Sequence, residues 1–415
     1  MNRILPLVSK VIADIEAPRE ALVSIANAIP YPSVTLAYAH AAISRRLLDT
    51  LPRTAHPAER SLWLQALGVM LSQLGRPAEA LPVTEEAVAI NRELATGDPD
   101  RYRPSLATSV GNLGLRLLEL GRPADALCVT EEAVAIRREL AAAEPNRYRH
   151  SLAASLTNLS SALSELGRPA DALTVTEEAV SIRRELAAAD PDRYRSDLAA
   201  SMNNLGLQLS NLGRAKDALP ITEEASAIYR ELAVADPDRY RPDLAASLTN
   251  LGVRLSELGR PAGALPVDQE AVAIHKELAA ASPDRYRRDL AASLTNLGRR
   301  LSELGRPADA LTVTEEAVSI RRQLAAAYPD RYRPDLADSL NNLGVRLSEL
   351  GRPADALLAE QEAVRIRREL AAANPDRYRP GLAIALSSNA AVGPIGLISA
   401  DNGSPLAGEL VSVWD

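Results

Sequence analysis

The sequence of 415 residues contains no phenylalanine, and aromatic side chains make up only 3% of it. The buried core must therefore consist mainly of Leu, Ala, Val and Ile. Small and aliphatic side chains of this kind favour helices that approach one another closely along a stack, and they suit one large globule less well. At this length the chain is long enough for several globular domains or for one extended repeat array.

Cysteine is almost absent: the one residue, Cys128, excludes an internal disulfide and is typical of a reducing compartment. No stretch reaches the ~18 consecutive apolar residues of a membrane-spanning helix. Lys10, Asp14 and Glu16 interrupt the early apolar run, which argues against a signal peptide. We therefore expect a cytoplasmic protein with no membrane partner.

Concentrated positive charge is also missing. The net charge is −7 with both signs interspersed, which argues against a nucleic-acid partner. The sequence offers no glycine-rich phosphate loop and no nucleophile elbow, and its four histidines share no spacing typical of metal ligands. We predict a protein that is not an enzyme, with no catalytic residue, no metal and no cofactor. The four histidines are His40, His56, His150 and His275.

A 46-residue repeat dominates what is present. Leu248, Leu251 and Leu255 follow a helical spacing. Gly259 is placed to end that helix, and Pro261 to begin a second one. The segment Pro-Asp-Arg-Tyr then suggests a longer return loop before the next repeat. The Leu-Gly-Arg sequence that marks each tight turn has its glycine at Gly75, Gly121, Gly167, Gly213, Gly259, Gly305 and Gly351.

One helical hairpin cannot cover its own apolar face, so neighbouring hairpins must stack. The sequence thus predicts an all-α fold, a right-handed α-solenoid of about seven hairpins over residues 62–380 with a concave inner surface. Residues 1–61 are interpreted as a degenerate helical N-terminal cap, with helical segments at about 4–15, 17–28 and 35–51. Residues 381–415 are interpreted as a short capping helix and a loose tail.

The pattern Leu-x-x-Leu-Gly-x-x-Leu, followed by Gly-Arg-Pro-Ala-x-Ala-Leu, resembles the tetratricopeptide repeat. It is most similar to the longer-period variety of kinesin light chains and of bacterial and fungal signalling proteins. The resemblance covers about residues 61–378 and is met by Leu251, Gly252 and Ala264. Leu248 and Leu255 depart from it, because many family members have Trp and Tyr there. The resemblance implies a scaffold whose concave surface binds a protein or peptide.

Six asparagines stand in one register of the first helices, at or near the concave surface that the resemblance implies. A side-chain amide both donates and accepts hydrogen bonds. The row is therefore interpreted either as a holder of the backbone of an extended peptide or as a set of bonds between adjacent repeats. The six are Asn112, Asn158, Asn204, Asn250, Asn296 and Asn342.

Two further positions adjoin this row. Arg254, Arg300 and Arg346 lie four residues after an Asn, and a Glu lies seven after it, so all three share one side of the helix. We expect mainly a solvated, ion-paired face and keep the arginines as candidate peptide-binding residues. Val253 and its counterparts three residues after the Asn either pack on a neighbouring helix or form a shallow apolar strip.

The repeated tyrosines follow Pro-(Asp/Asn)-Arg in the expected return loop. We interpret them as wedges that brace one hairpin against the next, and reject stacking on nucleic-acid bases. They are Tyr102, Tyr148, Tyr194, Tyr240, Tyr286, Tyr332 and Tyr378.

The leading functional hypothesis is a protein–protein interaction scaffold that binds a peptide or partner segment on its concave surface. The alternative is a structural, self-assembling sensor arm of a larger signalling system whose effector is on another chain, which leaves a homo-oligomer open. Near-identical repeats say little about which side chains a partner must carry, because specificity needs differences along the groove.

Overall fold

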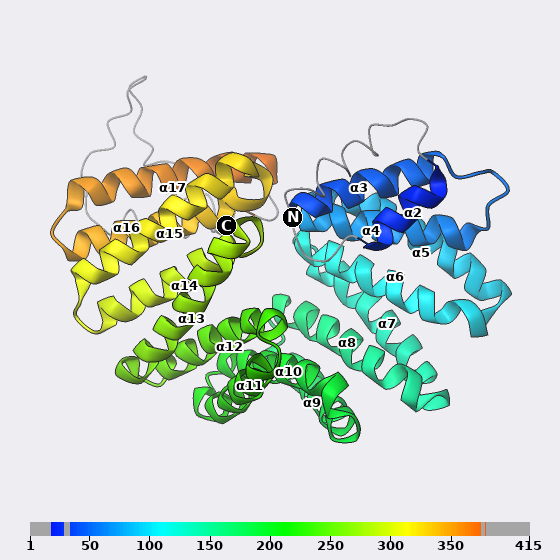
Figure 1. Ribbon diagram of the computed structural model, residues 1–415, viewed down its shortest axis with the longest axis horizontal. Coiled ribbons are helices and arrows are strands. Elements are labelled where there is room, and N and C mark those ends of the chain that lie inside the picture. Colours follow the sequence, from blue (N-terminus) through cyan, green and yellow to red (C-terminus); the bar gives the residue numbers. More distant parts are fainter. Residues whose placement is uncertain (1–17, 29–33, 375–377, 379–415) are drawn as a thin grey trace, which may run out of the picture.

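The computed structural model describes residues 18–28, 34–374 and 378, and within them the chain forms sixteen helices and no strand (Figure 1). The predicted α-solenoid is therefore confirmed. The helices are α2 (Arg19–Ala28), α3 (Val34–Asp49), α4 (Pro57–Gln73), α5 (Pro77–Gly97), α6 (Pro99–Glu119), α7 (Pro123–Ala143), α8 (Pro145–Glu165), α9 (Pro169–Ala189), α10 (Pro191–Asn211), α11 (Ala215–Ala235), α12 (Pro237–Glu257), α13 (Pro261–Ala281), α14 (Pro283–Glu303), α15 (Pro307–Ala327), α16 (Pro329–Glu349) and α17 (Pro353–Ala373).

The tight turn within each hairpin is as predicted. After α12, Gly259 adopts a φ of 66°, in the left-handed region that glycine tolerates best. Its N–H donates to the carbonyl of Ser256 at 2.8 Å, and the N–H of Arg260 donates to the carbonyl of Leu255 at 2.9 Å. These two bonds satisfy the last carbonyls of the helix. Pro261 then opens α13 at a position where its missing N–H removes no helical bond.

The predicted longer return loop is wrong. A single residue, such as Asp236, links one hairpin to the next, and its carboxylate accepts a hydrogen bond from the N–H of Arg239 at 3.2 Å. The Pro-Asp-Arg-Tyr segment forms the first turn of the next helix, because proline is favoured at the first helical position. Two 21-residue helices, a three-residue turn and one linking residue account for the repeat length.

The tyrosines consequently lie in helices and not in loops, which corrects their predicted placement. Tyr240, in the first turn of α12, is 7% exposed and belongs to a core cluster with residues of α10, α11 and α13. The guanidinium of Arg239 lies 4.9 Å from the centre of its ring. The described tyrosines therefore do join successive hairpins, as the wedge interpretation required.

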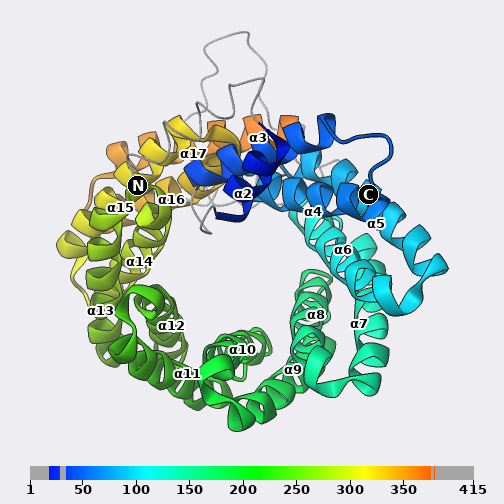
Figure 2. The ribbon, with the colours of Figure 1, turned by 45° about the vertical axis from the view of Figure 1, so that its right-hand side comes forward.

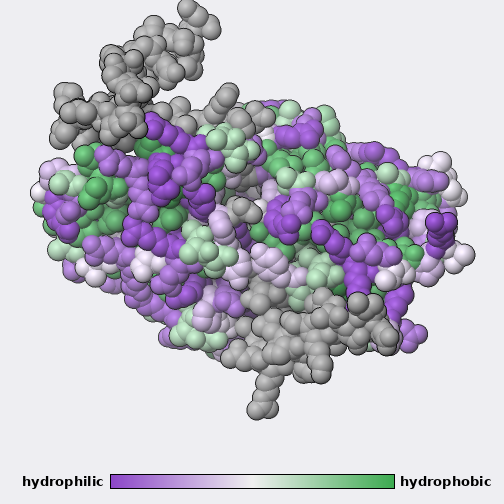
Figure 3. Space-filling model, turned by 90° about the horizontal axis from the view of Figure 1, so that it is seen from above, coloured by the Kyte–Doolittle hydropathy of each residue, from purple (hydrophilic) through white to green (hydrophobic). Residues whose placement is uncertain are grey.

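Figure 2 shows the consecutive hairpins arranged as a ring, with the first helices α4, α6, α8, α10, α12, α14 and α16 on the inside. The second helices of the hairpins lie on the outside: α5, α7, α9, α11, α13, α15 and α17. Fully buried alanines such as Ala218, Ala264 and Ala310 allow the two layers to approach closely. Seen from above, hydrophilic residues cover much of the surface and small apolar areas interrupt them (Figure 3).

The ring closes on itself where the first hairpin meets the last ones, and we call this contact the seam. Tyr38 of α3 stacks on Tyr328, just before α16, with ring centroids 6.1 Å apart. Gly75, in the turn after α4, lies so close to Arg331 that a β-carbon there would be 2.7 Å from that of the arginine. One superhelical turn of the repeats thus brings α3 to α14, and the turn after α4 to α16.

At the N-terminal end, α2 and α3 correspond to two of the three predicted helical segments, and α3 packs on α4. The predicted segment at 4–15 and the predicted capping helix and tail at 381–415 lie outside the described residues.

Candidate functional site

The asparagine row lies on the inner layer of helices, one residue each on α6, α8, α10, α12, α14 and α16. Asn250 and Asn342 are exposed, and the other four are half-buried. Asn158 illustrates the arrangement: its Nδ2 lies 3.8 Å from where a β-carbon of Gly111 on the preceding inner helix would be. The amide of Asn158 thus lies at the junction of two inner helices, and all six asparagines keep some exposure to solvent.

None of these six amides takes part in a hydrogen bond within the described part of the chain. A fully buried amide without a hydrogen-bond partner would destabilise the fold. A half-exposed amide can bond water or a ligand instead. The predicted hydrogen bonds between adjacent repeats are therefore not found among these residues. The amides remain available on the inner surface.

The arginines that follow the row lie elsewhere than expected. Arg254 is 6% exposed, and its Nη1 donates to the carbonyl of Gly206 on the preceding inner helix at 3.2 Å. Arg300 is 0% exposed and donates in the same way to the carbonyl of Gly252 at 2.9 Å. The expected solvated face is thus wrong for these two residues. Each forms a cross-link between successive inner helices.

The glutamates complete this cross-link. Glu303 pairs with Arg300 and accepts a hydrogen bond from the hydroxyl of Ser256, on the preceding inner helix, at 3.0 Å. Arg346 is less buried than the other two arginines, and its Nη1 lies 3.2 Å from Glu349. Arg and Glu at this spacing therefore fix the separation of the hairpins.

The apolar position three residues after the asparagine is partly open. Leu207 is 48% exposed and Val345 46%, and Val253 is half-buried. Ser161 and Arg299 take this position on α8 and α14, so the apolar strip along the inner helices is interrupted twice. Where it continues, it offers aliphatic contact beside the amides.

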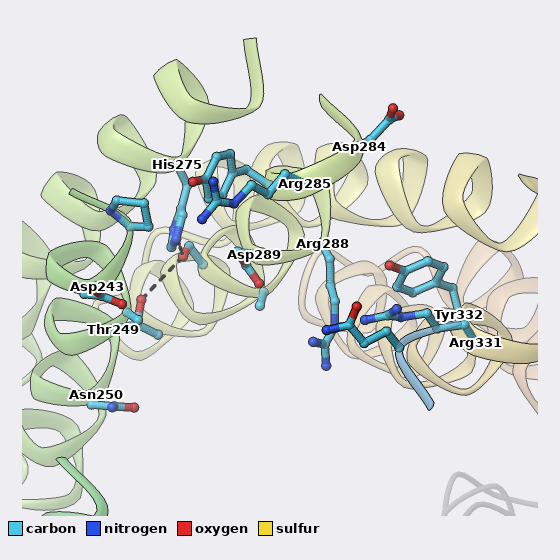
Figure 4. A pocket seen from close by; sticks show the side chains of 16 residues that line it. Asp243, Thr249, Asn250, His275, Asp284, Arg285, Arg288, Asp289, Arg331 and Tyr332 are labelled. Atoms are coloured by element: carbon cyan, nitrogen blue, oxygen red, sulfur yellow. Dashed lines mark hydrogen bonds between the residues drawn. The ribbon is translucent and has the colours of Figure 1, made fainter. Parts of the chain in front are cut away.

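Next to Asn250 the inner surface deepens into a cavity of about 500 Å³ at the seam (Figure 4). Its wall includes His275, whose imidazole Nδ1 lies 2.7 Å from the hydroxyl of Ser293. Burial lowers the pKa of His275, with Asp289 acting in the opposite direction. His275 was not among the site residues predicted from the sequence, because the four histidines share no register. Its departure from the repeat, where Arg183 and Arg321 occupy the same position, was the available signal.

In the described ranges, no group of three or more His, Cys, Asp and Glu side chains is arranged to hold a metal ion. Nor is any helix of those ranges long and apolar enough to cross a membrane. Cys128 lies exposed on α7, in the outer layer.

Many solved structures match this chain. A Rap protein complexed with Competence and Sporulation Factor has 13% identity and a TM-score of 0.55, over 88% of this chain and 97% of that one. The apo form of RapI has 14% identity and a TM-score of 0.51, over 70% and 93%. A putative kinesin light chain of P. anserina with nearly identical TPR-like repeats has 23% identity and a TM-score of 0.42, over 55% and 99%. At these identities the two Rap structures show a shared fold.

Among proteins with curated descriptions, none matches the sequence. The family model described as tetratricopeptide repeat matches residues 62–100, 152–192, 198–238, 244–284, 290–326 and 336–375, which is more than half of the chain. The chain belongs to the tetratricopeptide repeat family, whose helical scaffold is generally non-catalytic and typical of protein–protein interaction.

Proposed function

We propose that this chain is a protein-binding scaffold that holds an extended segment of a partner protein along its inner surface. The observation that carries the proposal is the row of six amides, which face solvent between inner helices and form no hydrogen bond within the described residues. A Rap protein with the same fold has been solved in complex with Competence and Sporulation Factor, which supports a binding role for this fold.

The chemistry of the row suits a peptide backbone. Each amide offers one carbonyl acceptor and two N–H donors, which match the N–H and C=O of an extended segment whatever its sequence. Leu207, Val253 and Val345 lie beside the row and provide contact for aliphatic side chains. Arg346, less buried than its counterparts, remains in the proposed surface. Arg254 and Arg300 affect the proposed binding surface indirectly, because they set the spacing of the inner helices.

Peptide selection tests this proposal. A random-peptide display library is selected against the full chain, and the affinity of the tightest peptide is measured. The triple variant Asn204→Ala, Asn250→Ala, Asn296→Ala removes three amides. Each net hydrogen bond contributes about 1 kcal/mol, so the affinity is expected to fall by about 100-fold.

The matched control removes hydroxyls from the outer layer. Thr174→Ala and Thr312→Ala change exposed residues of α9 and α15 whose hydroxyls bond only within their own helices. This variant is expected to bind the peptide like the unchanged chain. If the triple asparagine variant also did so, the amide row would have no part in recognition.

Self-assembly is the alternative to partner binding, and light scattering separates the two. A monomer that captures the selected peptide supports the scaffold. An oligomer that grows with concentration and binds no peptide supports the structural arm of a larger system.

A further inference from the structure

An arginine of an outer helix contacts an aspartate of the next inner helix at two junctions, but not at every one. On α9, Arg183 Nη1 donates to the carbonyl of Asp197 on α10 at 2.8 Å. On α15, Arg321 Nη1 donates to the carbonyl of Asp335 on α16 at 3.1 Å and lies 3.2 Å from its carboxylate. At these two junctions a guanidinium therefore lies beside the Asp, and on α16 it also pairs with the carboxylate.

The two junctions in between keep the aspartates, Asp243 and Asp289, but have lost the arginine. Tyr229 takes its place on α11 and donates its hydroxyl to the carbonyl of Ser196 at 3.0 Å, and not to Asp243. His275 takes its place on α13 and pairs with Ser293. Neither Asp243 nor Asp289 has an ion pair or a hydrogen bond anywhere in the described ranges. Asp243 and Asp289 thus lack the arginine of the preceding outer helix, which at the other two junctions contacts the carbonyl of Asp197 and the carboxylate of Asp335.

Both carboxylates line the cavity of about 500 Å³ at the seam. Figure 4 shows Asp243 and Asn250 on one side of it, Asp289 in the middle, and Arg331 and Tyr332 opposite. Gln73, from the first hairpin, lines it across the seam. The cavity therefore continues the inner surface that carries the amide row, and it opens where the arginine side chains of the repeat are missing.

The buried histidine adds an acceptor to this wall. His275 is 3% exposed, and its Nε2 forms no hydrogen bond with the described residues. The hydroxyl of Thr249 donates to the carbonyl of Ala245 at 2.9 Å, so its oxygen is left to accept from Ser293, 3.4 Å away. Ser293 then accepts from Nδ1–H of the imidazole. This tautomer, assigned from the chain of bonds, leaves Nε2 without a proton and able to accept a hydrogen bond.

The positive groups of the cavity are already engaged. Arg285 lies 4.8 Å from the ring centre of Tyr286, and Arg331 lies 5.3 Å from that of Tyr332, as their counterparts do in the other repeats. Arg288, which is specific to α14, lies 3.7 Å from Asp335. Burial raises the pKa of Asp243, although Arg285 and Arg239 oppose this shift without forming an ion pair with it. The acidic side chains of the cavity without an ion pair or a hydrogen bond to the described residues are thus Asp243 and Asp289.

We propose that this cavity binds the guanidinium of an arginine side chain presented by the partner segment, in place of the arginine that the repeat lacks at His275. The inference rests on the proposed function, because the arginine arrives on a segment that lies along the amide row. Such a site would also give the inner surface a position that discriminates between partners, which near-identical repeats cannot provide. A planar guanidinium donates to several acceptors at once, which suits two carboxylates and an imidazole nitrogen.

The test titrates the full chain with N-acetyl-arginine amide by calorimetry. N-acetyl-citrulline amide is the matched probe, since it has nearly the same shape and no charge. The chain is expected to bind the arginine probe at least tenfold more tightly than the citrulline probe. Equal binding of the two, no binding, or preferential binding of N-acetyl-aspartate amide would overturn the proposal.

Two variants assign the binding to this cavity. His275→Arg restores the residue found at Arg183 and Arg321, and it is expected to abolish binding of the probe while circular dichroism shows an intact helical fold. Asp289→Asn changes one oxygen to a nitrogen and is expected to lower the affinity for the arginine probe by about tenfold. Probe affinity unchanged in both folded variants would contradict the assignment.

The double variant Asn204→Ala, Asn296→Ala separates this inference from the proposed function. It leaves the cavity intact and is expected to bind the arginine probe normally while losing affinity for a selected peptide. If the unchanged chain bound the probe but captured no peptide, the arginine site would stand and the proposed peptide-binding surface would be refuted. If it captured a peptide but did not bind the probe, the peptide-binding surface would stand and the arginine site would be refuted.

Discussion

At the scale of single residues, departures from the repeat carry more information than the repeat itself. Asp268 stands where most hairpins have threonine, and it is buried against Arg300, with Nε of the arginine 3.0 Å from Oδ2. The spacing of Arg and Glu predicted a solvated surface, because nothing in one helix shows that the next hairpin covers it. The asparagine register was readable from sequence, and the burial of the arginines beside it was not.

A variant series tests this buried pair. Arg300→Ala leaves the Asp268 carboxylate without its cation and is expected to lower the free energy of unfolding by about 3 kcal/mol. The double variant Asp268→Thr, Arg300→Ala recreates the pair Thr130 and Ala162, which another junction already contains. It is expected to regain most of the loss in urea denaturation. A double variant no more stable than Arg300→Ala would show that the buried charge is not the cause.

At the scale of helices, the sequence predicted the tight turn correctly and the return connection incorrectly. Leu-Gly-Arg-Pro contains a residue that ends a helix and one that begins the next, and both signals are local. Pro-Asp-Arg-Tyr contains the same kind of start signal, but proline and aspartate are also typical of loops. Burial of Tyr240 between hairpins favours the helical conformation of this segment, and such burial depends on residues far along the chain.

Two glycines with the same backbone conformation provide a matched test of the turns. Gly259, at φ 66°, has no atom within 4 Å of an added β-carbon, so Gly259→Ala adds backbone strain of about 1 kcal/mol and little else. Gly75, at φ 73°, meets Cβ and Cα of Arg331 across the seam. Gly75→Ala is expected to add the same strain and also to part the seam, seen as a larger radius of gyration in X-ray scattering. Equal radii for the two variants would mean that the seam is open in solution.

At the scale of the whole molecule, the stack forms a ring with two unlike faces. The inner layer carries the amides, the apolar positions and the cavity, and the outer layer carries ion pairs that link successive hairpins. One pair joins Arg138 to Glu178 and another joins Arg322 to Glu362, each at 2.6 Å. Exposed pairs of this kind each contribute only about 0–1 kcal/mol. The hairpin order was predictable from the repeat, but the closure at Tyr38 and Tyr328 was not, because small rotations accumulate over the whole stack.

The most direct test of the account compares thiol labelling on the two layers. The native Cys128 reports on the outer layer, and Asn204→Cys in a Cys128→Thr background reports on the inner one. Each protein is treated with a maleimide, with and without a peptide selected from the display library. A peptide bound along the inner layer is expected to slow labelling at position 204 by tenfold or more and to leave labelling of Cys128 unchanged. Slower labelling of Cys128, with no change at position 204, would contradict it.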